Sequence, residues 1–298
     1  MKCLYVYNPK SGKQSHEKNT CYIVSKLKSK YDVVDVKATT KRGDAGKYAM
    51  DACGVYDVLV ISGGDGTVNE VINAIAIKND RPKIGYIPTG TTNDLAHSLK
   101  IPTKIKKALN IILNGKTTKH DIFKINNMFG IYVCAFGIFT ASSYTASQNQ
   151  KKTFGKLAYY FTGVKEIGSA KKFHLTLEGN NYLVEDDVIL GIIANSRYVS
   201  GYKINKMAKC DDGYVNVILF KERKKKGISL KMLLKVIRLF LFGVTTLNNS
   251  KDCVILKLNK FRIDFKENPT INVDGENAFN GSFELEVLKE HIEIFVKG

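Results

Sequence analysis

The chain has 298 residues and a formal net charge of +18 at pH 7, a length that suits one large or two ordinary domains. Apolar residues make up 44% of it, enough for real cores, and no uninterrupted apolar run of about 18 residues exists to span a membrane. Six scattered cysteines without CxxC spacing argue against metal and redox motifs and favour reduced thiols. So large a positive charge indicates a polyanionic partner, either nucleic acid, nucleotide or anionic membrane.

Short apolar runs alternate with helical patterns over the first 114 residues. The runs predict strands at residues 2–7, 32–36, 57–61 and 83–87. Helices are expected up to about Lys30, from Gly43, across Val68–Ile75, and over about 94–114 with a break near Pro102. Alternation of this kind predicts an α/β domain with a doubly wound, mainly parallel sheet.

A glycine-rich stretch, Gly63-Gly64-Asp65-Gly66-Thr67, lies where the buried strand 57–61 gives way to a helix. Glycine lets the backbone turn tightly and approach a ligand closely, and the N–H groups of a helix start favour phosphate. An aspartate in such a site suggests a bridging divalent cation. The alternative is a βα turn that uses glycine only for its geometry.

Similar polar segments follow the other three strands, namely Asn8–Gly12, Thr39 and Thr89–Asp94. Ligands of open α/β sheets bind along the carboxyl edge of the strands, so these segments predict one site; otherwise they are ordinary loops. Neither GxxxxGK[ST] nor GxGxxG occurs, so a nucleotide would not be held as in P-loop or dinucleotide-binding proteins.

The pattern changes to paired strands beyond about residue 122. Strands are expected at 122–126, 129–136, 173–178, 182–194, 214–220, 253–258, 261–265, 270–274, 283–288 and 291–296, with the last two as a closing pair. This predicts a mainly antiparallel second domain, a sandwich or a barrel, of which we expect the β-sandwich, and a division into 1–122 and 123–298. The end of the chain soon after 296 suggests that no segment returns to the first domain.

Two helical segments interrupt these strands, Lys151 to about Gly168 and Leu230 to Phe242. The second carries Lys231, Lys235 and Arg238 in one narrow stripe and follows a basic run, Lys221–Lys226. Basic amphipathic helices suit anionic membrane surfaces. Alternatively, each helix packs its apolar face on the sheet and leaves the lysines in solvent.

Five motifs occur in an order typical of one family. They are Asn8-Pro9-Lys10-Ser11-Gly12, Gly63-Gly64-Asp65-Gly66-Thr67, Pro88-Thr89-Gly90-Thr91-Thr92-Asn93-Asp94, Asp211-Asp212-Gly213 and Asp274-Gly275-Glu276. Together they resemble the soluble diacylglycerol kinase and sphingosine kinase family, in its bacterial lipid kinase branch. The resemblance covers almost the whole chain, and the later motifs distinguish it from the more distant NAD kinases and phosphofructokinases.

The resemblance implies ATP bound in a cleft between the two domains, with a first domain that binds nucleotide and a second that takes the lipid. Residues of the first domain would contact the nucleotide: Asn8, Pro9, Lys10, Ser11, Gly12, Thr39, Gly63, Gly64, Asp65, Gly66, Thr67, Asn69, Thr91, Thr92 and Asn93. Asp65, Asp94 and Asp121 would form an acidic network for Mg²⁺. A structural Mg²⁺ would be held by Asp212 with backbone carbonyls of Lys209 and Tyr214, and Glu276 would be the general base.

These roles agree with the chemistry, because phosphoryl transfer needs charge neutralisation and a positioned hydroxyl. Each acidic residue also has a simpler interpretation. Glu276 could be a solvated residue of an Asp-Gly hairpin turn, and Asp212 part of a turn only. Asp121 could be exposed before a strand, and Asp94 could cap the next helix. The five histidines lack metal spacing and are interpreted as structural or surface residues.

We therefore expect an ATP- and Mg²⁺-dependent lipid kinase, with diacylglycerol as the leading acceptor. The first residues resemble no signal peptide, so we expect a cytoplasmic enzyme on the inner face of the membrane, held by anionic lipid, with a homodimer left open. The alternatives are a kinase of another lipid or of NAD, and a silent nucleotide- or lipid-binding regulator. Nucleic-acid binding is not expected, since no recognition motif is present.

Overall fold

A computed structural model describes the chain except for residues 10, 12–15, 139–170, 223–226 and 248, and it describes only the backbone of residues 16–18 and 277. The described chain forms two compact units. Unit 1 comprises Met1–Tyr132, Lys209–Gly213 and Leu288–Gly298, and unit 2 comprises Val133–Ala208 and Tyr214–Val287. These limits differ from the expected 1–122 and 123–298, because two short segments from the second half of the chain pack into unit 1.

Unit 1 is built on a mainly parallel sheet, as the alternating pattern predicts. Its strands are β1 (Lys2–Tyr7), β2 (Val33–Ala38), β3 (Val58–Gly63), β4 (Lys83–Pro88), β5 (Lys116–Ile125), β6 (Met128–Gly130) and the end of β15 (Phe283–Val296). The order is β2-β1-β3-β4-β15-β5-β6, and the pairs from β2 to β15 are parallel. All six residues of β3 are buried, as expected for an apolar strand in the centre of a covered sheet.

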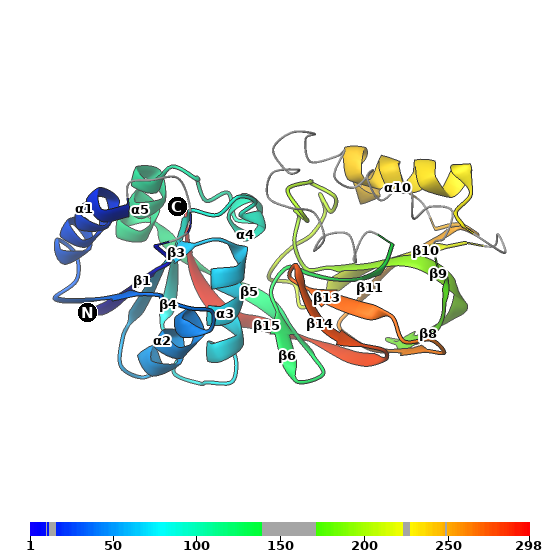
Figure 1. Cartoon of the computed structure of the whole chain (residues 1–298), viewed down its shortest axis with the longest axis horizontal. Helices are drawn as coiled ribbons and strands as arrows, with labels where there is room; N and C mark the ends of the chain where they lie inside the picture. Colours follow the sequence, from blue (N-terminus) through cyan, green and yellow to red (C-terminus); the bar gives the residue numbers. More distant parts are fainter. Residues whose placement is uncertain (10, 12–15, 139–170, 223–226, 248) are drawn as a thin grey trace. The chain divides into compact units, whose positions relative to one another are not determined.

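Helices cover both faces of this sheet (Figure 1). They are α1 (His16–Lys28), α2 (Asp44–Ala52), α3 (Asp65–Ile75), α4 (Asp94–Ser98) and α5 (Ile105–Asn114). α2 packs beside α3 on one face, and α1 lies beside α5 on the other. The interruption between α4 and α5 falls at Pro102, where the sequence predicts it.

Unit 2 is mainly antiparallel. Its strands are β7 (Val133–Gly137), β8 (Phe173–Gly179), β9 (Tyr182–Ala194), β10 (Val215–Lys221), β11 (Cys253–Leu258), β12 (Lys260–Phe265), β13 (Thr270–Val273), β14 (Glu276–Asn280) and the start of β15. They follow the order β14-β13-β7-β9-β8-β12-β15, with β10 also on β9 and β11 on β10.

The two-sheet sandwich expected for this unit is replaced by one branched hydrogen-bonded sheet. The cause is the length of β9, whose 13 residues serve two sets of partners. Its first half, as far as Val188, pairs with β8. Its second half lies between β7 and β10.

Five phenylalanine rings from five different strands of unit 2 form a connected aromatic cluster. Phe136 lies 4.9 Å from Phe265 and 6.5 Å from Phe283, centroid to centroid. Phe173 lies 6.4 Å from Phe265, and Phe279 lies 6.0 Å from Phe283. Edge-to-face pairs at such distances are the preferred aromatic geometry, so these contacts link the side chains of five strands.

Three expectations about strands are wrong. β7 separates from the expected strand 129–136 and pairs with β9 and β13 instead of continuing the hairpin of β5 and β6. The expected closing pair 283–288 and 291–296 is the single strand β15, with a local positive φ of 51° at Glu290. β15 also returns to unit 1, where Ile294 pairs with Ile84 of β4, so the return segment that we expected to be missing is present.

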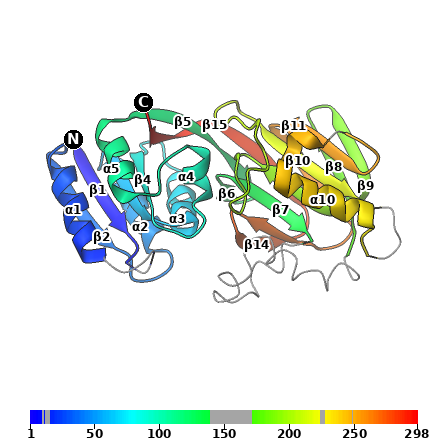
Figure 2. The ribbon, with the colours of Figure 1, turned by 90° about the horizontal axis from the view of Figure 1, so that it is seen from above.

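One long amphipathic helix of unit 2, α10 (Leu230–Phe242), lies over one face of the sheet, above β10 (Figures 1 and 2). Its residues Met232, Val236 and Leu239 are buried. The other expected helix, Lys151–Gly168, lies outside the described residues, as do four residues of the basic run before α10. Of the helices that the structure describes, none is long and apolar enough to cross a membrane.

Candidate active site

The four polar segments meet at the carboxyl edge of the unit 1 sheet, as the sequence predicts. The amide of Asn8 donates to the carbonyl of Ser62 at 2.9 Å, which links the end of β1 to β3. The Thr39 amide donates to Tyr7 at 2.9 Å, and the Thr89 amide donates to Gly63 at 2.9 Å. The loops that follow these adjacent parallel strands therefore lie side by side along the carboxyl edge of the sheet.

Side chains also join segments that are distant in sequence. The hydroxyl groups of Ser11 and Thr89 are 2.8 Å apart, and the Ser11 hydroxyl also donates to the carbonyl of Asn8 at 2.8 Å. Thr91 is exposed on the same loop as Thr89, whereas Lys10 and Gly12 lie outside the described residues. The structure thus brings the first and fourth predicted segments together.

The second and fourth segments touch backbone to backbone. A Cβ placed on Gly90 would lie 2.5 Å from the Cα of Gly64, and a Cβ on Gly63 would lie 2.5 Å from the Thr67 hydroxyl. Real Cβ atoms do not approach so closely, so both positions require glycine. Gly66 differs, because a Cβ there would meet no atom within 4 Å. The absence of a side chain at Gly66 leaves open space above the start of α3, where the first N–H groups have no partner within the helix.

Asn93 holds the fourth segment in shape. It adopts a left-handed conformation with φ of 53°, which asparagine tolerates better than most residues. Its side-chain oxygen accepts the Gly90 amide at 2.9 Å, and its side-chain nitrogen donates to the Gly90 carbonyl at 2.8 Å. Asn93 was predicted to contact the nucleotide, and the structure gives its buried side chain a structural task in the loop.

Tyr86 is a site residue that sequence reasoning missed. Its buried hydroxyl lies 3.3 Å from the carbonyl of Gly63 and 3.2 Å from the side-chain oxygen of Asn93. Burial raises the pKa of Tyr86, and the charges of Asp65 and Asp94 raise it further. The signal was a hydroxyl within the run 84–87, which is otherwise without polar side chains, since a buried hydroxyl needs a partner.

Asp65 is the first residue of α3. It lies where the segment Gly63–Thr67 meets the segment Thr89–Asp94, and we call these two segments the glycine loops. Burial raises the pKa of its carboxyl group, and the backbone N–H groups of Leu95, Asn93 and Asp94 oppose that rise. Its Oδ1 atom is buried and has no hydrogen-bond partner among the described residues. A buried carboxylate oxygen without a partner is costly, so it needs a proton or a cation.

Asp94 lies close to this group and is 2% exposed. It is the first residue of α4, and the cap position before it is occupied by Asn93, whose side chain makes no cap hydrogen bond. Helix capping by Asp94, the simpler interpretation, is therefore not what the structure shows. The charges of both Asp65 and Asp94 act on Tyr86, a residue of β4 whose hydroxyl contacts Gly63 and Asn93.

Asp121 is fully buried and holds backbone together, so the interpretation as an exposed residue is wrong. Its Oδ2 accepts the Gly213 amide at 2.6 Å, and its Oδ1 accepts the Glu290 amide at 2.7 Å. Among the described residues no three His, Cys, Asp or Glu side chains form a metal-binding group. Asp65 and Asp94 belong to the two loops, and Asp121 ties β5 to two later segments of unit 1. The acidic network of Asp65, Asp94 and Asp121 around Mg²⁺ stays a prediction.

The predicted structural Mg²⁺ site falls on the turn that Asp121 holds. Gly213 has a φ of 78°, which confirms a turn at Asp211-Asp212-Gly213 before β10. Asp212 is half-buried and Lys209 is exposed, both in unit 1, whereas Tyr214 is the first residue of the next unit 2 segment. The role of Asp212, Lys209 and Tyr214 as Mg²⁺ ligands stays a prediction.

Glu276 is the first residue of β14 and follows a two-residue hairpin turn. Asp274 and Gly275 have φ of 51° and 90°, and Glu276 pairs with Val273 across the turn. Positive φ at both turn positions is the type I′ geometry that Asp-Gly favours. Asp274 is also an anchor, because its amide donates to the Val133 carbonyl at 2.8 Å and its Oδ1 accepts the Val133 amide at 3.0 Å. Glu276 is half-buried on this fixed hairpin of unit 2.

Comparison with known proteins agrees with this geometry. Residues 2–125 match the family profile of the diacylglycerol kinase catalytic domain. A diacylglycerol kinase from Staphylococcus epidermidis is 33% identical over 292 residues, which cover 97% of this chain and 90% of that protein. One from Staphylococcus aureus is 34% identical over the same shares of both chains. The chain belongs to the diacylglycerol kinase family. It is accordingly a kinase, and the family implies ATP as the co-substrate.

Solved structures show the same fold. A candidate diacylglycerol kinase from Bacillus anthracis matches with a TM-score of 0.85 at 26% identity, covering 99% of this chain and 96% of that one. Another diacylglycerol kinase structure from the same organism matches with a TM-score of 0.79 at 23% identity, which shows the fold alone. The similarity therefore extends over both units and beyond the catalytic-domain profile.

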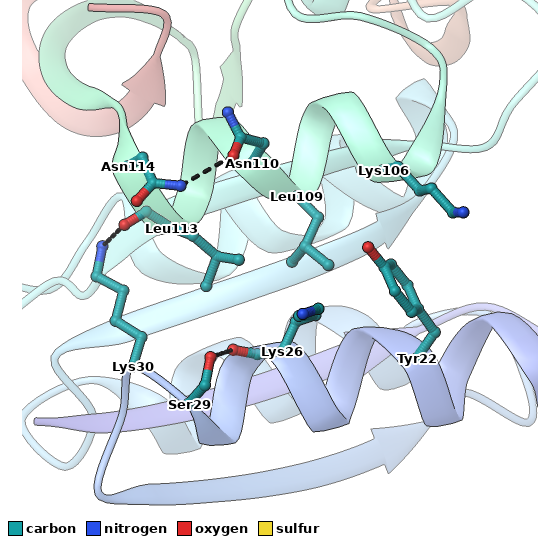
Figure 3. A pocket seen from close by; sticks show the side chains of 9 residues that line it. All are labelled: Tyr22, Lys26, Ser29, Lys30, Lys106, Leu109, Asn110, Leu113 and Asn114. Atoms are coloured by element: carbon teal, nitrogen blue, oxygen red, sulfur yellow. Dashed lines mark hydrogen bonds between the residues drawn. The ribbon is translucent and has the colours of Figure 1, made fainter.

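A groove lies between α1 and α5, and no residue of the glycine loops lines it (Figure 3). Its lining contains Tyr22, Lys26, Lys30 and Lys106 but none of the predicted site residues. Lys30 donates to the carbonyls of Ile112 and Leu113 at 2.9 and 2.7 Å, as a cation at a helix carboxyl end is expected to do. We therefore assign this groove to helix packing and keep the carboxyl edge of the sheet as the candidate site.

Proposed function

We propose that this protein transfers the γ-phosphoryl group of ATP to the free hydroxyl of diacylglycerol, which yields phosphatidic acid and ADP. A bond forms between the hydroxyl oxygen and the γ-phosphorus, and the bond from that phosphorus to the β–γ bridging oxygen breaks. The observation that carries the proposal is the convergence of two glycine loops on Asp65, whose buried Oδ1 has no partner among the described residues.

The phosphates of ATP would lie above the start of α3. Gly66 leaves open space there, and the positive end of the helix dipole favours anions. The segments around Asn8, Thr39 and Thr91 border the same rim and would contact the rest of the nucleotide. Phosphoryl transfer depends mainly on positioning and on stabilisation of charge, and fixed backbone N–H groups supply both.

The residues present fit a magnesium ion at this edge. Mg²⁺ prefers oxygen ligands and retains several waters, so a sparse set of carboxylates is sufficient. Asp65 and Asp94 would hold it, because they lie in the two touching loops and Asp65 offers an unsatisfied oxygen. When bound, the ion would neutralise charge on the phosphate oxygens.

Glu276 is proposed as the general base, which accepts the proton of the acceptor hydroxyl. A base works only if its rotamer is fixed within hydrogen-bond reach of that proton. The type I′ turn and the two hydrogen bonds between Asp274 and Val133 fix the backbone that carries it. The lipid would bind through unit 2, and the net charge of +18 supports attachment to the anionic inner face of the membrane.

A lipid panel tests this function directly. The full chain is assayed with labelled ATP and Mg²⁺ against diacylglycerol, monoacylglycerol, phosphatidylglycerol, sphingosine and undecaprenol, with NAD as the soluble acceptor. We expect phosphate transfer to diacylglycerol above all others. Transfer to NAD, or tight ATP binding without turnover on any acceptor, would overturn the proposal.

Two substitutions test the assigned roles. Asp65→Asn removes a charge that burial disfavours, so it should preserve or raise the melting temperature while it abolishes transfer. Glu276→Gln should abolish transfer with ATP binding unchanged. Asp51→Asn and Glu178→Gln, at exposed positions, are matched controls for the loss of a carboxylate. Retained transfer in either site variant would remove the role given to that residue.

A further inference from the structure

The outward side of α10 carries large apolar side chains in a continuous stripe. Leu230 is 72% exposed, Leu234 56%, Leu241 52% and Phe242 55%. We call these four residues, with the exposed Lys231 and Arg238, the α10 outer face. The positions 230, 234, 238 and 241 recur at intervals of four, four and three, so they lie on one side of the helix. Single exposed leucines are common, but four large apolar groups along one helix form a patch that indicates an interaction site.

The helix is fixed in this orientation by its other contacts. The Ser229 hydroxyl accepts the Met232 amide as an N-cap, and the buried Glu222 accepts both the amide and the hydroxyl of Ser229, at 2.7 and 2.8 Å. At the other end, the Val244 amide donates to the carbonyl of Ile204. Because three residues of the helix are already buried against unit 2, rotation to hide the outer face would expose them instead.

The charges of this helix all have one sign. Residues 230–242 contain Lys231, Lys235 and Arg238 and no acidic residue. Asp252 lies beside the helix and binds both lysines, at 2.8 Å each, and these contacts lower its pKa to about 2. The helix and this flanking aspartate together remain cationic, next to a strongly apolar stripe.

We propose that the α10 outer face docks α10 in the plane of an anionic phospholipid bilayer. The leucine and phenylalanine side chains would enter the boundary of the acyl chains, while Lys231 and Arg238 would reach the phosphate groups. The 13 residues of α10 span about 20 Å, too short to cross the hydrocarbon core, so the helix lies flat. This proposal rests on the proposed function only in that the acceptor is a membrane lipid.

Charge complementarity favours a bilayer over the other occupants. Two copies of the outer face would bring like charges together, and α10 carries no acidic residue to compensate them. A nucleic acid would use the basic residues and leave four large apolar groups without a partner. An anionic bilayer satisfies the apolar and the basic components at once.

Vesicle co-sedimentation of the full chain tests the assignment. The vesicles contain phosphatidylcholine alone or with phosphatidylglycerol, and no diacylglycerol. The test variant is Leu230→Gln/Leu234→Gln/Leu241→Gln. The matched control is Val55→Gln/Ile77→Gln/Leu183→Gln, whose positions are 53%, 64% and 72% exposed. We expect the wild-type chain to prefer phosphatidylglycerol vesicles, with at least a tenfold loss of binding in the α10 variant and less than a twofold change in the control.

Three further measurements make the outcomes decisive. Far-ultraviolet circular dichroism and the melting temperature must show that both triple variants are folded. Equal vesicle binding by the α10 variant and the control would overturn the proposal. So would dissociation of a wild-type dimer by the α10 variant in analytical ultracentrifugation with unchanged vesicle binding, because a second copy would then occupy the face.

A kinase assay on a short-chain, water-soluble diacylglycerol separates this inference from the proposed function. The α10 variant should retain full activity on that acceptor and lose activity on vesicle-borne diacylglycerol. Absence of activity on the soluble acceptor in the wild-type chain, with α10-dependent docking intact, would refute the function and leave the docking surface standing.

Discussion

Replacement of Gly66 by alanine adds one methyl group at a point where the structure leaves open space. A Cβ at this position meets no atom within 4 Å, and the residue belongs to the first turn of α3. Its φ is not positive, so alanine fits the backbone without strain. The substitution therefore changes what can approach the helix start, and leaves the packing of the protein itself untouched.

The expected effects on stability and on ATP have opposite signs. Alanine in place of glycine in a compatible helical conformation should raise the free energy of unfolding by about 0.4–1 kcal/mol, because it restricts the unfolded chain. A phosphate group that lies against the bare backbone would be crowded by the methyl group. Crowding of a packed contact costs about 1–3 kcal/mol, which corresponds to a loss of about 5- to 150-fold in kcat/KM for ATP.

Urea unfolding and steady-state kinetics measure the two effects separately. ATP is varied at a saturating concentration of lipid, and isothermal titration with ATP alone checks binding without turnover. If the Gly66→Ala variant is as stable as expected but keeps the wild-type KM for ATP and the wild-type kcat, the phosphates do not lie over Gly66. The assignment of the nucleotide to the start of α3 would then be wrong.

Three further substitutions probe the framework around this site. Gly90→Ala should lower the free energy of unfolding by about 1–3 kcal/mol, since its Cβ would lie 2.5 Å from the Cα of Gly64, and a urea midpoint equal to that of the wild type would contradict the close contact of the loops. Asp121→Asn exchanges one acceptor for a donor that faces a backbone N–H, so urea unfolding should show a loss of about 1.5–3 kcal/mol; an unchanged midpoint would show that its two hydrogen bonds, at 2.6 and 2.7 Å, contribute nothing. Asp252 has a pKa lowered to about 2 in the folded protein, so its stabilising effect is complete above the ordinary value of 3.8 and disappears as the pH falls through about 2. Asp252→Asn should therefore flatten the acid side of the stability–pH curve in that interval, and an unaltered curve would argue against the two lysine contacts.

Most of unit 1 is predictable from the sequence, because its elements are specified by local patterns. The run 57–61 is apolar at every position, and the structure places it as β3 at the centre of a covered sheet. The break near Pro102 appears between α4 and α5 for a reason that lies in the proline itself. Parallel strands then carry the polar segments to one edge, so the rim of the site follows from strand order alone.

The errors come from long-range pairing, which no local pattern encodes. Polar residues around Glu290 resemble a turn, and the sequence therefore suggests two strands where β15 is one. In the structure the Glu290 amide donates to Asp121, 169 residues earlier in the chain, a contact that the local sequence does not reveal. Leu288–Gly298 also pairs with β4 and β5 of unit 1, so a single boundary at residue 122 does not describe the two units.

The aspartates that the sequence singled out differ in how many of their carboxylate oxygens have a hydrogen-bond partner. Asp121 was a candidate through the family resemblance, and both of its carboxylate oxygens accept backbone N–H groups. Asp65 accepts such groups on one side only, and its Oδ1 is the one carboxylate oxygen among the described residues that is buried without a partner. A folded chain retains such an oxygen only at a cost, and a bound cation with its phosphates would remove that cost.

This argument predicts how the Asp65→Asn substitution changes the free energy of unfolding, measured first without ATP and Mg²⁺ and then with both present. The variant should be at least as stable as the wild type when they are absent and less stable when they are present, because only the wild type gains a partner. If ATP and Mg²⁺ stabilise both proteins equally, Asp65 does not hold the ion.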